Sequence, residues 1–267
     1  MNNIYRTKPR NILLLNSLML AICGSVPIEV QASLPADAIL AFDLGVISCE
    51  GGVGTPPGNC YYGTNVTTGS YFAVDTNGDG IFAGIEKMPI ASNEGVRIGD
   101  VQPASGSHPG PPDGTESPSI DIPWLFFGNT GMHQTTLPVV IVNGDDGAGD
   151  NIASVDFSGW GVTWNGIPNI PLGGDGANFP SDTGTAVITC TSGCGVGDSF
   201  SLDHFAHVPL GDPSGFGGVF YTVHLEGVVD APQPAVRIDI EKLTNGNQAD
   251  GANDPDVPVM AQGEIVS

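Results

Sequence analysis

Short β-prone segments separated by glycine and proline run through most of this chain. The 267 residues include 39 Gly and 22 Pro. Between them lie runs rich in Val, Ile, Phe, Tyr, Trp and Thr, which are residues 70–74, 137–143, 153–165, 185–190, 198–210 and 218–229. Such runs bounded by turn residues are typical of β-strands, and no segment after residue 32 has a sustained helical pattern. We therefore expect an all-β fold, an antiparallel sandwich or jelly roll with long Gly/Pro-rich loops, over residues 33–230.

Residues 103–123, PASGSHPGPPDGTESPSIDIP, are too rich in proline for strands in the middle of a sheet. Proline cannot donate a hydrogen bond to a neighbouring strand, so it is confined to sheet edges and loops. We expect this segment to be a long surface loop.

The chain is strongly acidic. It has 7 basic and 29 acidic residues, which gives a formal net charge of −22. A surface of this sign repels nucleic acid and anionic lipid, and it attracts cations. Hydrophobic residues make up 40% of the chain and charged residues only 13%, which is the composition of a folded protein rather than a disordered one.

The first 32 residues have the features of a secretory signal peptide. The basic segment MNNIYRTKPR precedes the apolar run ILLLNSLMLAIC, which is shorter than the about 20 residues that span a membrane. The sequence VQA before Ser33 predicts cleavage after Ala32. We therefore expect a secreted protein, extracellular or on the bacterial cell surface, without a transmembrane helix in the mature chain. Lipid attachment at Cys23 is an alternative that the bulky Ile22 disfavours.

Four cysteines remain after the signal peptide, and they lie as two close pairs in the sequence. Four cysteines allow three pairings. We favour Cys49 with Cys60 and Cys190 with Cys194, because each pair closes a short Gly-rich loop. A four-cysteine metal site is the alternative, and an oxidising exterior makes it less favoured.

The segment DTNGDGIFAGIE has the spacing of a twelve-residue calcium loop. Such a loop supplies oxygen ligands from positions 1, 3 and 5, a backbone carbonyl at 7, often a water at 9 and a bidentate carboxylate at 12, with glycine at 6. These positions are occupied by Asp75, Asn77, Asp79, Ile81, Ala83 and Glu86, with Gly80 at position 6. We therefore predict that Ca²⁺ is bound by Asp75, Asn77, Asp79, Ile81 and Glu86.

Over these twelve positions the segment resembles the calcium loop of EF-hand and dockerin-like proteins. That resemblance implies an oxygen-lined Ca²⁺ site, but the flanking residues depart from the family. GSYFAV before the loop alternates like a strand, and Pro89 would break an exit helix almost at once. We therefore expect a structural calcium clip rather than a helix-flanked sensor. The alternative is a β-turn in which NGDG supplies positive φ angles.

A second acidic segment, residues 143–151, follows an apolar run. It lacks the spacing of a calcium loop and has no closing glutamate, so we interpret it as a solvated hairpin tip.

The sequence contains no catalytic motif that we can recognise. His204 and His207 lie three residues apart, which on a strand places them on opposite faces. The serine in GDPSGFGG does not lie in a G-x-S-x-G elbow. The remaining histidines, His108, His133 and His224, are isolated in the sequence. We therefore expect that the protein is not an enzyme, although convergence of these histidines in space remains open.

A carbohydrate-binding module is an alternative function. Trp160, Val162 and Trp164 share one face of an expected strand, and together with Trp124 they would form a platform on which a sugar stacks. Large aromatic residues at alternating positions are also typical of a sandwich core. Exposure of both Trp160 and Trp164 would favour the platform.

Residues 231–267 begin within the Pro-rich segment DAPQPA (residues 230–235) and differ in character from the rest. Residues 240–250 resemble the opening strand and loop of immunoglobulin-like repeats in large bacterial surface proteins, which begin IEKxTNGxDAD, with Gln248 in place of the first acid. Such a unit needs about 100 residues. We expect a linker and an incomplete second repeat, either mobile or with residues 236–240 added to an edge of the main sandwich.

Together these features predict a secreted calcium-binding protein of the cell surface or extracellular matrix with a structural or adhesive role. Its expected partners are calcium and a glycan or protein ligand, not nucleic acid.

Overall fold

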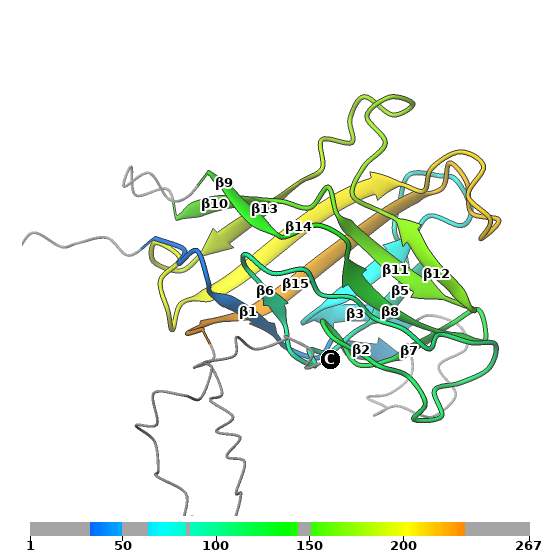
Figure 1. Cartoon of the computed structure of the whole chain (residues 1–267), viewed down its shortest axis with the longest axis horizontal. Coiled ribbons are helices and arrows are strands. Elements are labelled where there is room, and N and C mark those ends of the chain that lie inside the picture. The colour runs from blue at the N-terminus through cyan, green and yellow to red at the C-terminus, as the bar shows by residue number, and fades with distance from the viewer. Residues whose placement is uncertain (1–32, 50–63, 84–85, 144–150, 233–267) are drawn as a thin grey trace, which may run out of the picture. The chain divides into compact units, whose positions relative to one another are not determined.

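Two large antiparallel sheets and a separate two-stranded sheet form the folded part of this chain. The computed structural model describes residues 33–49, 64–83, 86–143 and 151–232. No α-helix occurs among these residues, and the two larger sheets share one apolar core (Figure 1). The expectation of an all-β, antiparallel sandwich is confirmed.

The larger sheet has nine strands in the order β5-β4-β15-β14-β13-β10-β9, with β1 paired to β15 and β6 paired to β1. Its strands are β1 (Ile39–Phe42), β4 (Tyr71–Val74), β5 (Lys87–Pro89), β6 (Val96–Arg97), β9 (Val140–Asn143), β10 (Ile152–Asp156), β13 (Thr185–Cys190), β14 (Ser199–His207) and β15 (Phe220–Asp230). One edge of β15 pairs with β14, and its other edge pairs with β4 near its start and β1 near its end. Ile39 therefore lies opposite Asp230.

The smaller sheet has four strands in the order β12-β11-β8-β7. They are β7 (Trp124–Phe126), β8 (Asn129–Thr135), β11 (Trp160–Trp164) and β12 (Ile167–Pro171), while β2 (Val46–Cys49) and β3 (Thr64–Thr68) pair separately. The chain passes from the larger to the smaller sheet between β10 and β11. The expected strand run 153–165 is therefore two strands, one in each sheet.

The two longest strands alternate between the core and solvent. Along β14, Phe200, Leu202, His204 and Ala206 are buried, and on β15 the buried residues begin with Tyr221 and recur at every second position. Fully burying a side chain such as Leu or Val contributes about 1.5–3 kcal/mol. This alternation fixes the register, because a one-residue slip would expose the whole apolar set.

The proline-rich residues 103–123 contain no strand, as expected, but they are not simply a surface loop. The Ser107 hydroxyl lies 2.6 Å from the Thr163 hydroxyl on β11, and the Ala104 amide donates to Gln134 on β8. Ile120 and Asp121 are fully buried. The segment thus covers the smaller sheet, which explains why every residue of β11 is buried. The segment is a long loop with many exposed residues, as expected, but part of it is buried, which glycine and proline content does not report.

A chain of buried hydrogen bonds links this segment to both sheets. The Asp121 carboxylate accepts from the Trp124 indole (2.9 Å), from the His133 amide (2.8 Å) and from the His133 ring Nδ1 (2.5 Å). The other ring nitrogen of His133 lies 2.9 Å from the Tyr221 hydroxyl, which also accepts from the Trp160 indole at 3.2 Å. Burial raises the pKa of Tyr221 far above its usual range, so this hydroxyl stays neutral. It therefore donates to His133 while accepting from Trp160.

The expected disulfide between Cys190 and Cys194 is present and closes the turn between β13 and β14. The other expected disulfide, Cys49–Cys60, cannot be compared, because Cys60 lies outside the described residues. Three further expected segments also lie outside them: the signal peptide, residues 144–150 of the second acidic segment, and the second repeat from residue 233 onward.

Candidate functional site

The predicted calcium loop connects two neighbouring strands. It leaves β4 after Val74 and returns at β5, whose residues Lys87, Met88 and Pro89 pair with Ala73, Phe72 and Tyr71. Residues 84–85 lie outside the described part. The loop therefore spans a β-hairpin, consistent with the strand-like flanks of the sequence.

Asp75 organises the first half of the loop. Its side chain accepts hydrogen bonds from the amides of Gly78 (2.8 Å), Asp79 (3.2 Å) and Gly80 (2.9 Å), and the residue is only 6% exposed. Gly78 and Gly80 have φ angles of 74° and 75°, which favour glycine. The Asp75 carboxylate thus holds the turn of residues 75–80 by bonding three backbone amides that follow it.

The next two candidate ligands continue this turn. Asn77 accepts from the Asp79 amide at 2.8 Å, and Asp79 accepts from the Ile81 amide at 2.8 Å. Each side chain bonds the backbone two residues onward, which is the hydrogen bond of an Asx-turn. Asn77, Asp79 and Ile81 are all exposed to solvent.

Glu86 closes the loop from its far end. One carboxylate oxygen accepts from the Thr76 amide (2.9 Å), the Thr76 hydroxyl (3.0 Å) and the Asn77 amide (3.3 Å), and the other accepts from the Ala83 amide (3.2 Å). Glu86 is 3% exposed. A simple β-turn would need neither Asp75 nor Glu86, and here these two residues hold the loop together.

In the part of the chain that the structure describes, the carboxylates of this loop have no basic partner. Within the described ranges, none of the ion pairs involves Asp75, Asp79 or Glu86. Lys87 is adjacent in sequence, but its ammonium group lies over the Tyr71 ring, 4.4 Å from its centre. Two buried carboxylates without a counter-charge are costly, and a bound cation would offset that cost.

The oxygen atoms of the loop are more widely spaced than those of another cluster. Among the described side chains, the group of three whose ligand atoms all lie within 4.8 Å of one another is His108, Asp113 and Glu116, not the three acids of the loop. Asn77 and the Ile81 carbonyl are the further oxygen ligands that the sequence predicts.

A groove of about 690 Å³ lies beside the loop. Its lining includes Asp75 and Asn77 of the loop and Phe205, His207 and Phe220 from β14 and β15. Phe205 is 46% exposed. The groove thus combines the acidic loop with aromatic rings.

His207 is held rigidly in this groove. Its Nδ1 lies 3.0 Å from Asp182, its amide donates to the same carboxylate at 2.6 Å, and its ring stacks on Phe179 at 4.0 Å. The pKa of Asp182 is lowered, because the hydrogen bonds from His207 outweigh the opposing effect of burial. Asp182 lies 25 residues before His207, and no sequence spacing linked the two.

The remaining histidines do not assemble with His207. His204 is buried on the opposite face of β14, as predicted, and bonds the Leu172 carbonyl at 2.8 Å. Burial lowers the pKa of His204, so it is neutral. His133 belongs to the buried chain with Asp121, and His224 lies between Asp203 and Glu226. Each described histidine is thus engaged with its own local partners.

The tryptophan platform predicted from the sequence is not present. Trp160 is 1% exposed, Trp164 is 7% exposed and Trp124 is 6% exposed. Their indole nitrogens donate to Tyr221, to the Phe126 carbonyl and to Asp121 respectively. These rings are core residues, because residues 103–123 cover one side of β11 and the larger sheet covers the other.

Comparisons with protein-family models, with curated proteins and with solved structures find no match to this chain. In the described ranges, no helix is of the length and apolar character needed to cross a membrane.

Proposed function

We propose that this chain is a secreted calcium-binding protein of the cell surface or extracellular matrix with a structural or adhesive role. Calcium occupies the loop between β4 and β5, with Asp75, Asn77, Asp79, the Ile81 carbonyl and Glu86 as ligands. The observation that carries the proposal is the pair of buried carboxylates, Asp75 and Glu86, which close the loop without any basic partner in the described structure.

The chemistry of the loop suits calcium better than softer metals. All five candidate ligands offer oxygen, which is the donor that Ca²⁺ prefers, and no histidine or cysteine is among them. The net charge of −22 attracts divalent cations in general. An extracellular module with a dissociation constant of about 10⁻⁴–10⁻³ M would be occupied at millimolar calcium.

The flanking strands favour a structural role for the ion. A sensor loop changes the angle between two helices, whereas this loop joins β4 to β5 within one sheet. Calcium would therefore fix a hairpin at the sheet edge.

Isothermal titration calorimetry tests the calcium site directly. Wild-type protein should bind one Ca²⁺ at this loop, and Asp75→Asn should weaken binding by about tenfold or more, because it removes a charge and a ligand oxygen. The matched control is Asp100→Asn, a change at an exposed carboxylate outside the loop. Absence of binding at millimolar calcium, or equal affinity in the two variants, would contradict the proposal. Far-UV circular dichroism checks that each variant is folded.

A glycan ligand is favoured by the groove beside the loop rather than by the tryptophans. Aromatic rings stack on the apolar faces of sugars, and Phe205 presents an exposed ring next to the acidic loop.

A glycan array with the mature chain tests this role. Binding should require calcium, and Phe205→Ala should weaken it by about tenfold. Val187→Ala on β13 is the control, because Val187 is also 46% exposed but lies outside the groove. If no glycan binds in the presence of calcium, or if both variants bind like wild type, the groove is not a glycan site.

A further inference from the structure

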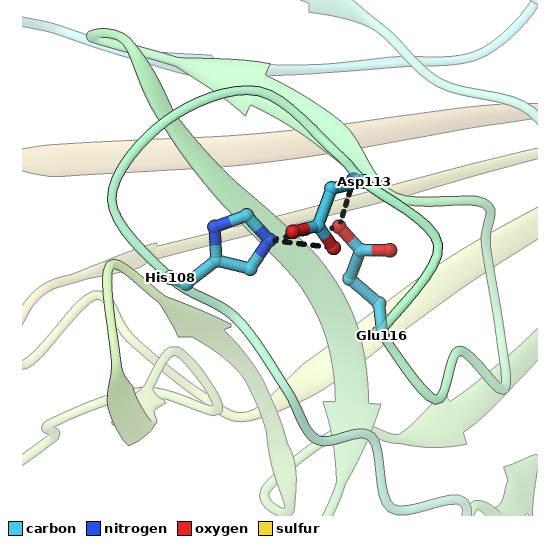
Figure 2. A group of neighbouring side chains, drawn as sticks. All are labelled: His108, Asp113 and Glu116. Carbon is cyan, nitrogen blue, oxygen red and sulfur yellow. Dashed lines mark hydrogen bonds and ion pairs between the residues drawn. The ribbon is translucent and has the colours of Figure 1, made fainter.

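A second cluster of metal-ligating side chains lies in residues 103–123, away from the calcium loop in sequence. The Nε2 atom of His108 lies 3.1 Å from Glu116 Oε1 and 3.5 Å from Asp113 Oδ1. Figure 2 shows the imidazole and the two carboxylates pointing toward one another. Three potential ligand atoms therefore face a common point.

The orientation of the His108 ring makes this convergence informative. Its Nδ1 lies 2.9 Å from the Pro109 carbonyl, which can only accept, so Nδ1 carries a hydrogen. In the neutral imidazole Nε2 then has a lone pair, and this lone pair faces two carboxylate oxygens. Only a cation between them, either a proton on Nε2 or a metal ion, makes this arrangement favourable.

Hydrogen bonds from the neighbouring backbone and from Thr115 fix the two carboxylates, and most of them reach the same oxygens that face His108. Glu116 accepts from the amides of Asp113 (2.9 Å) and Gly114 (2.8 Å), and its side chain is 2% exposed. Asp113 accepts from the Thr115 amide (3.0 Å) and hydroxyl (2.6 Å). Such supporting hydrogen bonds orient metal ligands and lower the cost of bringing them together.

The backbone around the cluster is also anchored. The amides of Ser105 and Ser117 each donate to the other's carbonyl, at 3.1 and 2.9 Å, which closes the base of the loop. The Thr130 amide of β8 donates to the His108 carbonyl at 3.0 Å. The three side chains are therefore held by a closed loop fastened to the smaller sheet.

His224 provides a contrast within the same molecule. It also has two acidic neighbours, but Asp203 contacts Nδ1 at 2.7 Å and Glu226 contacts Nε2 at 3.1 Å. The carboxylates thus lie at opposite sides of the ring, as in a bridging imidazolium. At His108 both carboxylates share one nitrogen, which is the arrangement for chelation.

We propose that His108, Asp113 and Glu116 bind a divalent transition-metal ion such as Zn²⁺, at a site separate from the calcium loop. One imidazole nitrogen and two carboxylate oxygens suit zinc and its neighbours, whereas calcium prefers oxygen ligands alone. The Asp113 side chain is 57% exposed, so the remaining coordination positions face solvent and water. The metal would fasten the turn of residues 108–116.

Zinc titration calorimetry on the full mature chain, in saturating calcium, tests the proposal. Wild type should bind one Zn²⁺ with micromolar affinity, and His108→Gln should weaken binding by about tenfold or more. His224→Gln is the matched control and should bind like wild type. Asp75→Asn should also leave zinc binding unchanged, which separates this site from the calcium loop.

Cobalt substitution gives a second readout, since the visible absorption of bound Co²⁺ reports its ligands and should be lost in His108→Gln. If that variant does not fold, as judged by circular dichroism, Asp113→Asn at the exposed ligand replaces it. The proposal would be overturned if wild type bound no zinc at concentrations up to about 1 mM. It would also be overturned if the His108 and His224 variants lost equal zinc affinity, and in either case the cluster would hold a proton only.

Discussion

Replacing Asp121 with alanine should lower the free energy of unfolding by about 3–5 kcal/mol. The substitution leaves the Trp124 indole, the His133 amide and the His133 ring nitrogen without their common acceptor, and all of these groups are buried. An unsatisfied buried polar group costs about 1–3 kcal/mol. The measurement is urea denaturation followed by circular dichroism and tryptophan fluorescence.

Asp100→Ala is the control, since Asp100 is exposed, and it should change stability by less than about 0.5 kcal/mol. Tyr221→Phe should cost an intermediate amount, because only the links to His133 and Trp160 are lost. A loss below about 1 kcal/mol for Asp121→Ala would mean that water or rearranged side chains satisfy the network.

Calcium should raise the melting temperature of the mature protein by about 5–10 °C at 10 mM. With a dissociation constant of about 10⁻⁴ M, this concentration stabilises the folded state by about 2.7 kcal/mol. Each kcal/mol shifts the melting temperature of a domain of this size by about 2–4 °C. Glu86→Gln should remove most of the increase, because Glu86 is the closing ligand and also holds Thr76 and Ala83.

Magnesium at the same concentration is the control for general screening of the acidic surface. Mg²⁺ demands a tighter octahedral shell and keeps its waters, so it should give a smaller increase. Equal increases with the two ions, retained in Glu86→Gln, would assign the effect to the surface charge rather than to the loop.

The sequence predicted the strands that alternate between core and solvent. β13, β14 and β15 were recognisable because one face is apolar and the other polar. β8, NTGMHQT, was missed because it has no such alternation, although six of its seven residues are buried. Its buried polar side chains bond residues of the segment 102–123, Tyr221 on β15 and residues of β12, which lie close only in the folded chain.

The two candidate metal-binding clusters show the same limit. The loop from Asp75 to Glu86 was recognisable as a candidate because its proposed ligands follow a fixed spacing within twelve residues. His108, Asp113 and Glu116 are equally close in sequence, but their spacing matches no common motif. Only the folded structure shows that Nδ1 bonds the Pro109 carbonyl while Nε2 faces the two carboxylates. The Asp121 network joins residues up to 100 positions apart, so no local pattern could predict it.

The pairing of β1 with the end of β15 brings the first and the last strand of the described domain side by side. Because Ile39 lies opposite Asp230, the chain enters and leaves this domain at the same place. The calcium loop and the groove lie at the other end of β15, beside Phe220, about 33 Å away along the strand. The two ends of the described domain therefore lie together, at the end of β15 opposite to the groove.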